Sequence, residues 1–311
     1  MYIHSHISAC NKSRSFKMTT SILNTNSNIA AQKFVEGKLG EIHFVNSAGI
    51  NMRYLKVGQG EPLVLIHTLR TQLEYFEKII PDLAKRYTVY ALDLPGHGQS
   101  EITNQNHVKP LFIHHVSEFI NELQLNNVTL VGESIGGAIA LGVASQGKVS
   151  IKEVFALNPA DYVNSNGLDR SSTLGKILFT GIKLPFFGWI IANAEKRDVL
   201  QQVLEGGFEN NDNLPAHLVD EFSKTGERAG YSKAFRSIFL NWESWTEDQQ
   251  QYPKINVPVT LVYAEQDWST KSERITCQKM IKNAKLISIE ATGHFSSLDN
   301  PEQVLNAILN G

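Results

Sequence analysis

Short runs of residues that are apolar on both faces recur along the chain and constrain its fold more than any other feature. The runs are PLVLIH (62–67), YTVYALD (87–93), NVTLVGE (127–133), IKEVFALN (151–158), VPVTLVYAE (257–265) and KLISIEA (285–291). A strand that is apolar on both faces belongs inside a sheet that helices cover on each side, which means a mostly parallel sheet.

Segments with helical spacing separate these strands. Ahead of the second strand, the apolar residues with this spacing are Leu73, Tyr75, Phe76, Ile79, Ile80 and Leu83. Alternation of strand and helix predicts right-handed crossovers, and hence an α/β fold with a doubly wound, mostly parallel sheet. Two alternating runs, EIHFV and NMRYLKV, precede this pattern and predict a hairpin at Ser47-Ala48-Gly49.

One long interval interrupts the alternation of strands and helices and indicates how the chain is divided into domains. Residues 161–252 contain helix-like stretches but no convincing strand, so we expect a helical cap inserted into a core of residues 39–160 and 253–311. The first 35 residues lack Asp and Glu and are rich in Ser, Asn and Thr. We therefore expect residues 1–38 to form a disordered tail, with a true start at Met18 or an organelle-targeting segment as alternatives.

Charge and cysteine content narrow the class of function. A formal net charge of −2, with 19% charged residues of both signs, provides no field that would recruit nucleic acid or an anionic membrane surface. Cys10 and Cys277 form neither a disulfide framework nor a metal-ligand spacing, and His114 and His115 have no Cys, Asp or Glu partner at such a spacing. We expect a cytoplasmic protein without a metal site that acts on a small molecule.

The motif that carries chemistry is Gly132-Glu133-Ser134-Ile135-Gly136, which fits G-x-S-x-G directly after a strand and at the beginning of a helix. The turn strains the serine backbone, and side chains at positions 132 and 136 would collide with the neighbouring strand and helix. The Ser134 hydroxyl should project above the carboxyl ends of the strands, where such sheets bind ligands. Phosphate-binding motifs are excluded, because G-x-x-x-x-G-K-[ST] is absent and the glycine spacing does not fit G-x-G-x-x-G.

A serine hydroxyl becomes a nucleophile when a base takes its proton, and that base is oriented by a carboxylate. We predict that His294, which follows the last strand, is the base. Asp267, which follows the preceding strand, is the favoured carboxylate, and the order Ser, Asp, His is that of doubly wound hydrolases. Asp161, at the end of the strand before the cap, and Glu265 are the alternatives.

With these motifs, with YALDLPGHGQS after the second core strand and with a cap in place, residues 41–311 resemble the α/β-hydrolase-fold superfamily. The resemblance is to its epoxide hydrolases, esterases and C–C bond hydrolases, and it implies a serine hydrolase without cofactors. Serine at position 134, where the epoxide hydrolases and haloalkane dehalogenases that resemble this chain carry aspartate, favours an esterase-like or lipase-like enzyme. The alternatives are C–C bond hydrolysis, perhydrolysis, acyl transfer or a non-catalytic ligand receptor.

The same resemblance implies that the backbone N–H groups of Leu69 and Ile135 form an oxyanion hole. The family usually has His-Gly after the first core strand, whereas this chain has His67-Thr68-Leu69-Arg70. β-Branched Thr68 resists the positive φ that glycine accepts, so either the hole is shaped differently or Arg70 helps to bind an anionic or carbonyl group. The candidate substrate-binding residues are His67, Thr68, Arg70, Trp268 and Phe295.

The predicted cap opens with the apolar segment 173–194, TLGKILFTGIKLPFFGWIIANA. Lys176, Lys183 and Pro185 interrupt it, so a membrane span is not expected. Its apolar side chains predict a pocket for a hydrophobic ester of medium or longer chain, the alternative being that they only pack the cap onto the core. They are Leu174, Ile177, Leu178, Phe179, Ile182, Leu184, Phe186, Phe187, Trp189, Ile190 and Ile191.

Overall fold

The computed structural model describes residues 39–162, 167–193 and 196–311, so the predicted tail lies outside the described residues. Eight strands form one sheet in the order β1-β2-β4-β3-β5-β6-β7-β8. Their bounds are β1 (Glu41–Ser47), β2 (Ile50–Val57), β3 (Glu61–Ile66), β4 (Tyr87–Leu92), β5 (Val128–Glu133), β6 (Ile151–Leu157), β7 (Val259–Ala264) and β8 (Lys285–Ile289). The pairs from β4 to β8 are parallel, whereas β2 pairs antiparallel with both β1 and β4.

The predicted hairpin and the predicted doubly wound sheet are both confirmed. Ser47 pairs with Ile50, and the two turn residues Ala48 and Gly49 both have positive φ, as a two-residue hairpin turn requires. From β3 the chain passes to β4 on one side and later to β5 on the other. The strand order therefore reverses between β3 and β5, and the crevice at the carboxyl ends of these strands is where such sheets bind ligands.

Helices cover both faces of the sheet because alternate strand residues point to opposite sides. Val64 and Ile66 belong to a buried apolar cluster with α3 and α4, while Leu63 and Leu65 belong to a second cluster with α2 and α13. The flanking helices are η1 (Leu73–Phe76), α2 (Ile80–Leu83), α3 (Lys109–Glu122), α4 (Ile135–Gln146), α11 (Lys271–Met280), α12 (Ser296–Asp299) and α13 (Pro301–Asn310).

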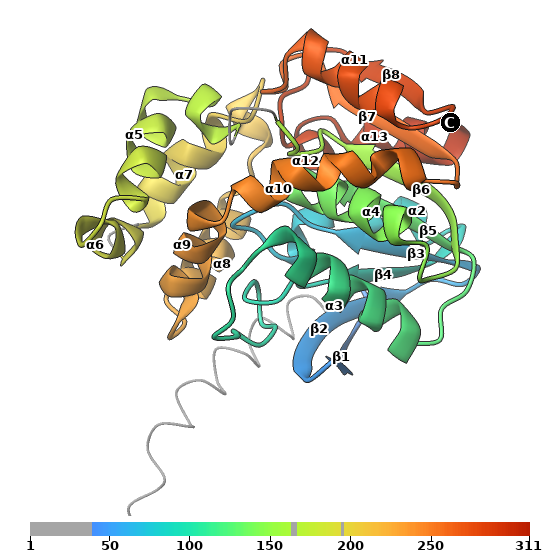
Figure 1. Cartoon of the computed structure of the whole chain (residues 1–311), viewed down its shortest axis with the longest axis horizontal. Coiled ribbons are helices and arrows are strands. Elements are labelled where there is room, and N and C mark those ends of the chain that lie inside the picture. The colour runs from blue at the N-terminus through green and yellow to red at the C-terminus, as the bar shows by residue number, and fades with distance from the viewer. Residues whose placement is uncertain (1–38, 163–166, 194–195) are drawn as a thin grey trace, which may run out of the picture.

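Between β6 and β7, the described residues contain helices and no strand. These helices are η2 (Leu168–Arg170), α5 (Thr173–Ile182), α6 (Phe187–Asn193), α7 (Arg197–Glu205), η3 (Asn211–Asn213), α8 (Ala216–Gly226), α9 (Tyr231–Leu240), α10 (Glu243–Glu247) and η4 (Asp248–Lys254). Figure 1 shows α5 to α9 gathered at one end of the molecule, beside the sheet. In the described part of the chain, no helix has the length and apolar content of a membrane span.

Candidate active site

Ser134 occupies the single-residue turn between β5 and α4. Its φ of 57° and ψ of −119° lie in a region that residues with a side chain rarely adopt. A Cβ atom at Gly132 would lie 2.1 Å from the carbonyl oxygen of Gly136, and one at Gly136 would lie 2.0 Å from that of Ile66 in β3. The collisions predicted from the motif are therefore present, and both involve backbone atoms that cannot rotate away.

Replacing Gly136 by alanine is expected to lower the free energy of unfolding by about 3 kcal/mol, because the added methyl group overlaps the backbone of β3. Urea denaturation followed by circular dichroism measures this change. Gly206→Ala is the matched control, since its Cβ would be 3.3 Å or more from the nearest atom outside the adjacent residues. Equal stability of the two variants would contradict the close approach of β3 and α4.

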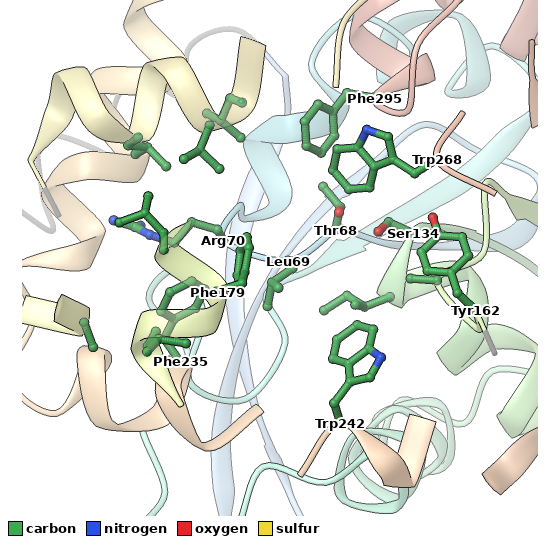
Figure 2. A pocket seen from close by; sticks show the side chains of 18 of the residues that line it. Thr68, Leu69, Arg70, Ser134, Tyr162, Phe179, Phe235, Trp242, Trp268 and Phe295 are labelled. Atoms are coloured by element: carbon green, nitrogen blue, oxygen red, sulfur yellow. The ribbon is translucent and has the colours of Figure 1, made fainter. Parts of the chain in front are cut away.

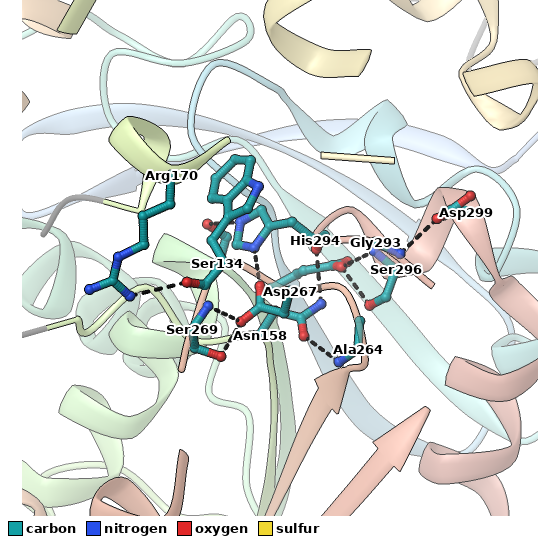
Figure 3. Close-up of polar contacts among 12 residues, drawn as sticks. Ser134, Asn158, Arg170, Ala264, Asp267, Ser269, Gly293, His294, Ser296 and Asp299 are labelled. Carbon is teal, nitrogen blue, oxygen red and sulfur yellow. Dashed lines mark hydrogen bonds and ion pairs between the residues drawn. The ribbon is translucent and has the colours of Figure 1, made fainter. Parts of the chain in front are cut away.

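The structure brings together the three residues predicted to form a nucleophile, a base and an acid (Figure 3). Nε2 of His294 lies 2.9 Å from Oγ of Ser134, and Nδ1 of His294 lies 2.5 Å from Oδ1 of Asp267. All three side chains are buried. Ser134 follows β5, Asp267 follows β7 and His294 follows β8, so the parallel strands deliver all three to one edge of the sheet.

Hydrogen bonds to Asp267 keep its carboxylate charged and in place. Oδ2 accepts from the backbone N–H of Ser269 at 2.9 Å and from the Ser269 hydroxyl, which itself accepts from Nε of Arg274 at 2.9 Å. Burial opposes ionisation, but the hydrogen bonds from His294 and Ser269 outweigh it, so the pKa of Asp267 lies below its ordinary value. An anionic Asp267 holds the His294 proton on Nδ1 and leaves Nε2 to accept from Ser134.

Asn158 and Trp268 fix the position of the His294 ring, and neither role was predicted from the sequence. Nδ2 of Asn158 donates to the carbonyl oxygen of His294 at 2.9 Å, and its Oδ1 accepts from the N–H of Ala264 at 2.7 Å. The indole of Trp268 stacks on the imidazole with ring centroids 3.8 Å apart and planes 12° apart. The sequence signal for Asn158 is a polar residue that ends the apolar run of β6 at the same edge of the sheet.

Glu133, the residue directly before the nucleophile, is buried and anchors the segment that follows His294. Its carboxylate accepts from the N–H of Ser296 at 2.5 Å, from the Ser296 hydroxyl at 2.6 Å and from the N–H of Ser297 at 3.3 Å. Burial raises its pKa despite these bonds. The signal in the sequence is an acidic residue where the strand is otherwise buried and apolar.

The alternative acids occupy other environments. Asp161 is buried, and its carboxylate accepts from Sγ of Cys277 at 3.5 Å. Burial raises the pKa of Asp161 to about 6, although the nearby Lys109 favours its charged form. Glu265 is exposed. Within the described residues, Nδ1 of His294 donates its hydrogen bond to Asp267 and to neither alternative.

A cavity that is open in part to solvent adjoins Ser134 (Figure 2). Its wall on the sheet side consists of Thr68, Leu69, Arg70, Ser134, Ile135, Ala160, Tyr162, Trp268 and Phe295. Its wall on the helical side consists of Leu178, Phe179, Ile182, Ile191, Ala192, Leu200, Val203, Leu204, Phe235 and Trp242. The lining is therefore almost entirely apolar.

Leu69 and Ile135, predicted to donate to an oxyanion, both line this cavity next to Ser134. Ile135 is the first residue of α4, so its N–H has no acceptor within the helix. Thr68 does not adopt the positive φ that it was expected to resist, and the residue with positive φ in this loop is Arg70, at 66°. The carbonyl oxygen of Thr68 accepts instead from the hydroxyl of Thr71 at 2.9 Å, which closes the loop without a glycine.

His67 does not line the cavity, unlike the other four predicted substrate contacts. Its ring is fully buried: Nε2 accepts from the N–H of Leu94 at 3.0 Å, and Nδ1 lies 2.7 Å from the carbonyl oxygen of Thr68. Burial lowers the pKa of His67 to about 4. His67 is a neutral structural residue that joins the loops after β3 and β4.

Arg70 provides the positive charge in the cavity wall. Its Nη1 donates to the carbonyl oxygen of Phe222 at 2.8 Å, and its guanidinium lies over the ring of Tyr231, 4.9 Å from the ring centroid. These contacts hold the side chain against α8 and α9. Among the described residues, no group of three or more His, Cys, Asp or Glu side chains is arranged to hold a metal ion.

Residues 206–213 of the helical segment are bound to the loop that carries His294. Asp299 accepts from the N–H of Gly293 and from that of Glu209, each at 2.8 Å. The N–H of Phe295 donates to the carbonyl oxygen of Gly207 at 3.1 Å. A Cβ atom at Gly293 would lie 2.4 Å from that same oxygen, so the two backbones are in close contact.

Comparisons with known proteins agree with this architecture. The profile described as "Alpha/beta hydrolase family" matches residues 63–307. A 2-hydroxy-6-oxo-6-(2'-aminophenyl)hexa-2,4-dienoic acid hydrolase from Metapseudomonas resinovorans is 25% identical over 86% of this chain and 89% of its own length. A solved epoxide hydrolase superposes with a TM-score of 0.76 at 20% identity, covering 86% of this chain and 97% of its own. A meta-cleavage product hydrolase from Pseudomonas fluorescens IP01 gives a TM-score of 0.72 at 17% identity, covering 86% and 96%.

Proposed function

Since the chain belongs to the alpha/beta hydrolase family, we propose that it is a cofactor-independent serine hydrolase that cleaves hydrophobic carboxylic esters. The observation that carries the proposal is the hydrogen-bonded series from Ser134 through His294 to the buried carboxylate of Asp267. A neutral imidazole in this position takes a proton from the serine and is stabilised, once charged, by the carboxylate.

The reaction then proceeds in two halves. Oγ of Ser134 attacks the ester carbonyl carbon while Nε2 of His294 takes its proton, and the N–H groups of Leu69 and Ile135 donate to the oxyanion. Collapse of this intermediate breaks the bond to the alcohol, which leaves with the proton from His294. Water, deprotonated by His294, attacks the acyl-enzyme, and collapse releases the acid and restores Ser134. The helices between residues 168 and 254 act in this proposal as the cap, since they supply the apolar wall of the cavity.

Labelling by a fluorophosphonate, combined with turnover of p-nitrophenyl butyrate, tests the proposal. We expect a single covalent adduct, located on Ser134 by peptide mass spectrometry, and loss of turnover in proportion to labelling. A folded sample that neither forms the adduct nor hydrolyses the ester would exclude the enzyme and favour the ligand receptor. Turnover that continues after Ser134 is fully labelled would place the reaction elsewhere.

A second candidate is hydrolysis of a C–C bond in a keto acid. It is favoured by the relative from Metapseudomonas resinovorans, whose named substrate carries a ketone and a carboxylic acid but no ester. Arg70 would pair with such a carboxylate from the cavity wall. Comparing kcat/KM for p-nitrophenyl butyrate with that for a 2-hydroxy-6-oxo-6-aryl-hexa-2,4-dienoic acid, followed by its absorbance, separates the two candidates.

The apolar cavity predicts a dependence of the rate on acyl length. Extending p-nitrophenyl acetate by four methylene groups is expected to raise kcat/KM by about two orders of magnitude, at ~0.8 kcal/mol for each buried methylene. Steady-state rates across the series measure this increase. A flat or falling series would mean that the apolar side chains only pack the helices onto the core.

Neighbouring residues of α5 provide a matched pair for the same measurement. Leu178 lines the cavity, whereas Ile177 is exposed on the outer face of the helix. Leu178→Phe is expected to shorten the preferred acyl chain because it fills part of the cavity, while Ile177→Phe leaves the preference unchanged. Equal effects of the two variants would argue against the cavity as the acyl site.

A further inference from the structure

Helices α5 and α6 and their connecting turn carry large apolar side chains on the surface as well as in the cavity. The exposed ones, which we call the apolar tip, are Ile177, Leu184, Phe186, Phe187, Trp189 and Ile190. Phe186 is 92% exposed and Trp189 is 62% exposed. In Figure 1, α6 lies at the extreme of the molecule away from the sheet. A concentration of exposed aromatic and aliphatic side chains of this kind marks an interaction surface.

Close packing of the two helices leaves the apolar tip no room to fold inward. A Cβ atom at Gly181 would lie 2.7 Å from Cδ1 of Ile191, and one at Gly188 would lie 2.2 Å from the carbonyl oxygen of Ile182. Arg236 of α9 donates through Nε to that same oxygen at 2.9 Å, which secures the end of α5. The turn is therefore held in a conformation that presents its side chains to the outside.

Phe186 marks the strained position in this turn, with a φ of 63° in the left-handed region that favours glycine. The neighbouring residues 183–187 are all exposed. A large aromatic residue that is both strained and almost fully exposed contributes little to the folded monomer. A contact between the Phe186 side chain and another molecule would explain both its strained backbone and its exposure.

The charges within the segment that forms the apolar tip have one sign. No Asp or Glu occurs between Asp169 and Glu195, whereas Lys176 and Lys183 are exposed beside the apolar side chains. The net charge of −2 for the whole chain conceals this local excess of positive charge. Apolar and aromatic residues flanked by lysines are the composition of surfaces that bind anionic lipid headgroups.

We propose that the apolar tip docks on the surface of an anionic phospholipid bilayer. Phe186, Phe187 and Trp189 would enter the boundary between headgroups and acyl chains, while Lys176 and Lys183 contact lipid phosphates. A second copy of the chain is a poorer partner, because a two-fold contact would bring its lysines against these. The N-terminal residues 1–35 are also a poor match, because they contain basic residues and no acidic ones.

Docking in this manner also places the substrate cavity close to the lipid. Phe179, Ile182 and Ile191 belong to the same two helices as the apolar tip and line the cavity. The cavity wall and the docking surface are therefore separated by about one helix diameter, roughly 10 Å. The binding surface itself does not depend on the reaction proposed for Ser134.

Vesicle flotation with the full chain tests the proposal. Vesicles of phosphatidylcholine alone are compared with vesicles that also contain phosphatidylglycerol, and binding to the anionic vesicles is expected to be tighter by about ten-fold or more at low salt. Of the four tryptophans, Trp189 is exposed, Trp268 is half-buried and Trp242 and Trp245 are buried, so the emission should shift to shorter wavelength on binding as Trp189 enters the lipid. Failure to bind anionic vesicles would overturn the proposal.

Variants separate the apolar and charged contributions. Phe186→Ser with Trp189→Ser is expected to weaken vesicle binding by about ten-fold or more. Lys176→Ser with Lys183→Ser should remove the preference for phosphatidylglycerol. Phe44→Ser is the matched control, because Phe44 is an exposed aromatic residue on β1, and it should bind as the wild type does. Hydrolysis of p-nitrophenyl acetate should be the same in all of them.

Two outcomes would reassign the apolar tip. Wild-type binding in the Phe186→Ser, Trp189→Ser variant would overturn docking through the tip and transfer the lipid contact to another basic segment, such as residues 1–35. A dimer seen by sedimentation velocity in the wild type and lost in this variant, without vesicle binding by either, would make the tip an interface between copies of the chain.

Discussion

Ser134→Ala is expected to lower kcat for ester hydrolysis by about 10⁴- to 10⁶-fold. Losses of this size follow when the nucleophilic serine of a Ser-His-Asp hydrolase is removed. The methyl group of alanine fits the same turn, so the fold should be unchanged. The remaining activity would come from substrate binding and the backbone donors, which do not involve the hydroxyl. Initial rates with p-nitrophenyl butyrate measure the loss.

Ser117→Ala is the matched control for this experiment. Ser117 is also buried, and its hydroxyl donates to the carbonyl oxygen of Ile113 within α3, away from the cavity. Its activity should equal that of the wild type, and circular dichroism should be the same for all three proteins. A Ser134→Ala variant with near wild-type activity would remove Ser134 from the mechanism, and an equal loss in Ser117→Ala would point to general destabilisation.

Asp267→Asn is expected to lower kcat by about 10⁴-fold while leaving the geometry intact. An asparagine amide cannot hold the Nδ1 proton as the charged Asp267 does, and it cannot stabilise the imidazolium that forms when His294 takes the serine proton. Because the pKa of Asp267 lies below its ordinary value, the carboxylate is charged throughout the neutral range, and the loss should appear at every pH from weakly acidic to basic.

Asp161→Asn provides the comparison that decides between the two acids. Asp161 contacts Cys277, and its hydrogen bonds do not include His294 among the described residues. We expect a change in kcat of less than about three-fold, since no partner of the imidazole is removed. If Asp161→Asn loses more activity than Asp267→Asn, the assignment of the acid is reversed.

The sheet was predictable because its strands are marked by local composition. Six runs apolar on both faces, with helical spacing between them, are enough to specify a parallel sheet covered on both sides. The end strand was harder: β8 extends over Lys285–Ile289 rather than to residue 291, and Leu286 is 39% exposed because β8 is an edge strand. Apolar residues alone do not distinguish an edge strand from a central one.

Ser134, Asp267 and His294 could be proposed from the sequence because each follows a strand, and parallel strands end at one edge. Asn158 and Glu133 are also polar residues at this edge, but their partners are the backbone of His294 and of Ser296, and no sequence pattern indicates a contact with a backbone group. The orientation of α5 and α6 could not be predicted from the sequence either. A segment that is apolar on all sides does not indicate which side faces the cavity, and so the exposed side chains of the apolar tip were predicted to line it.

The attachment of residues 206–213 to the His294 loop has a consequence for how molecules reach the site and leave it. Lifting this segment would break its bonds to Phe295, the residue after His294, and to Asp299, and would disturb the loop that holds His294 beside Asp267. We therefore expect residues 206–213 to stay bound to the His294 loop through every turnover. The hydrogen bonds from Ser134 through His294 to Asp267 would then stay assembled while substrate and product exchange.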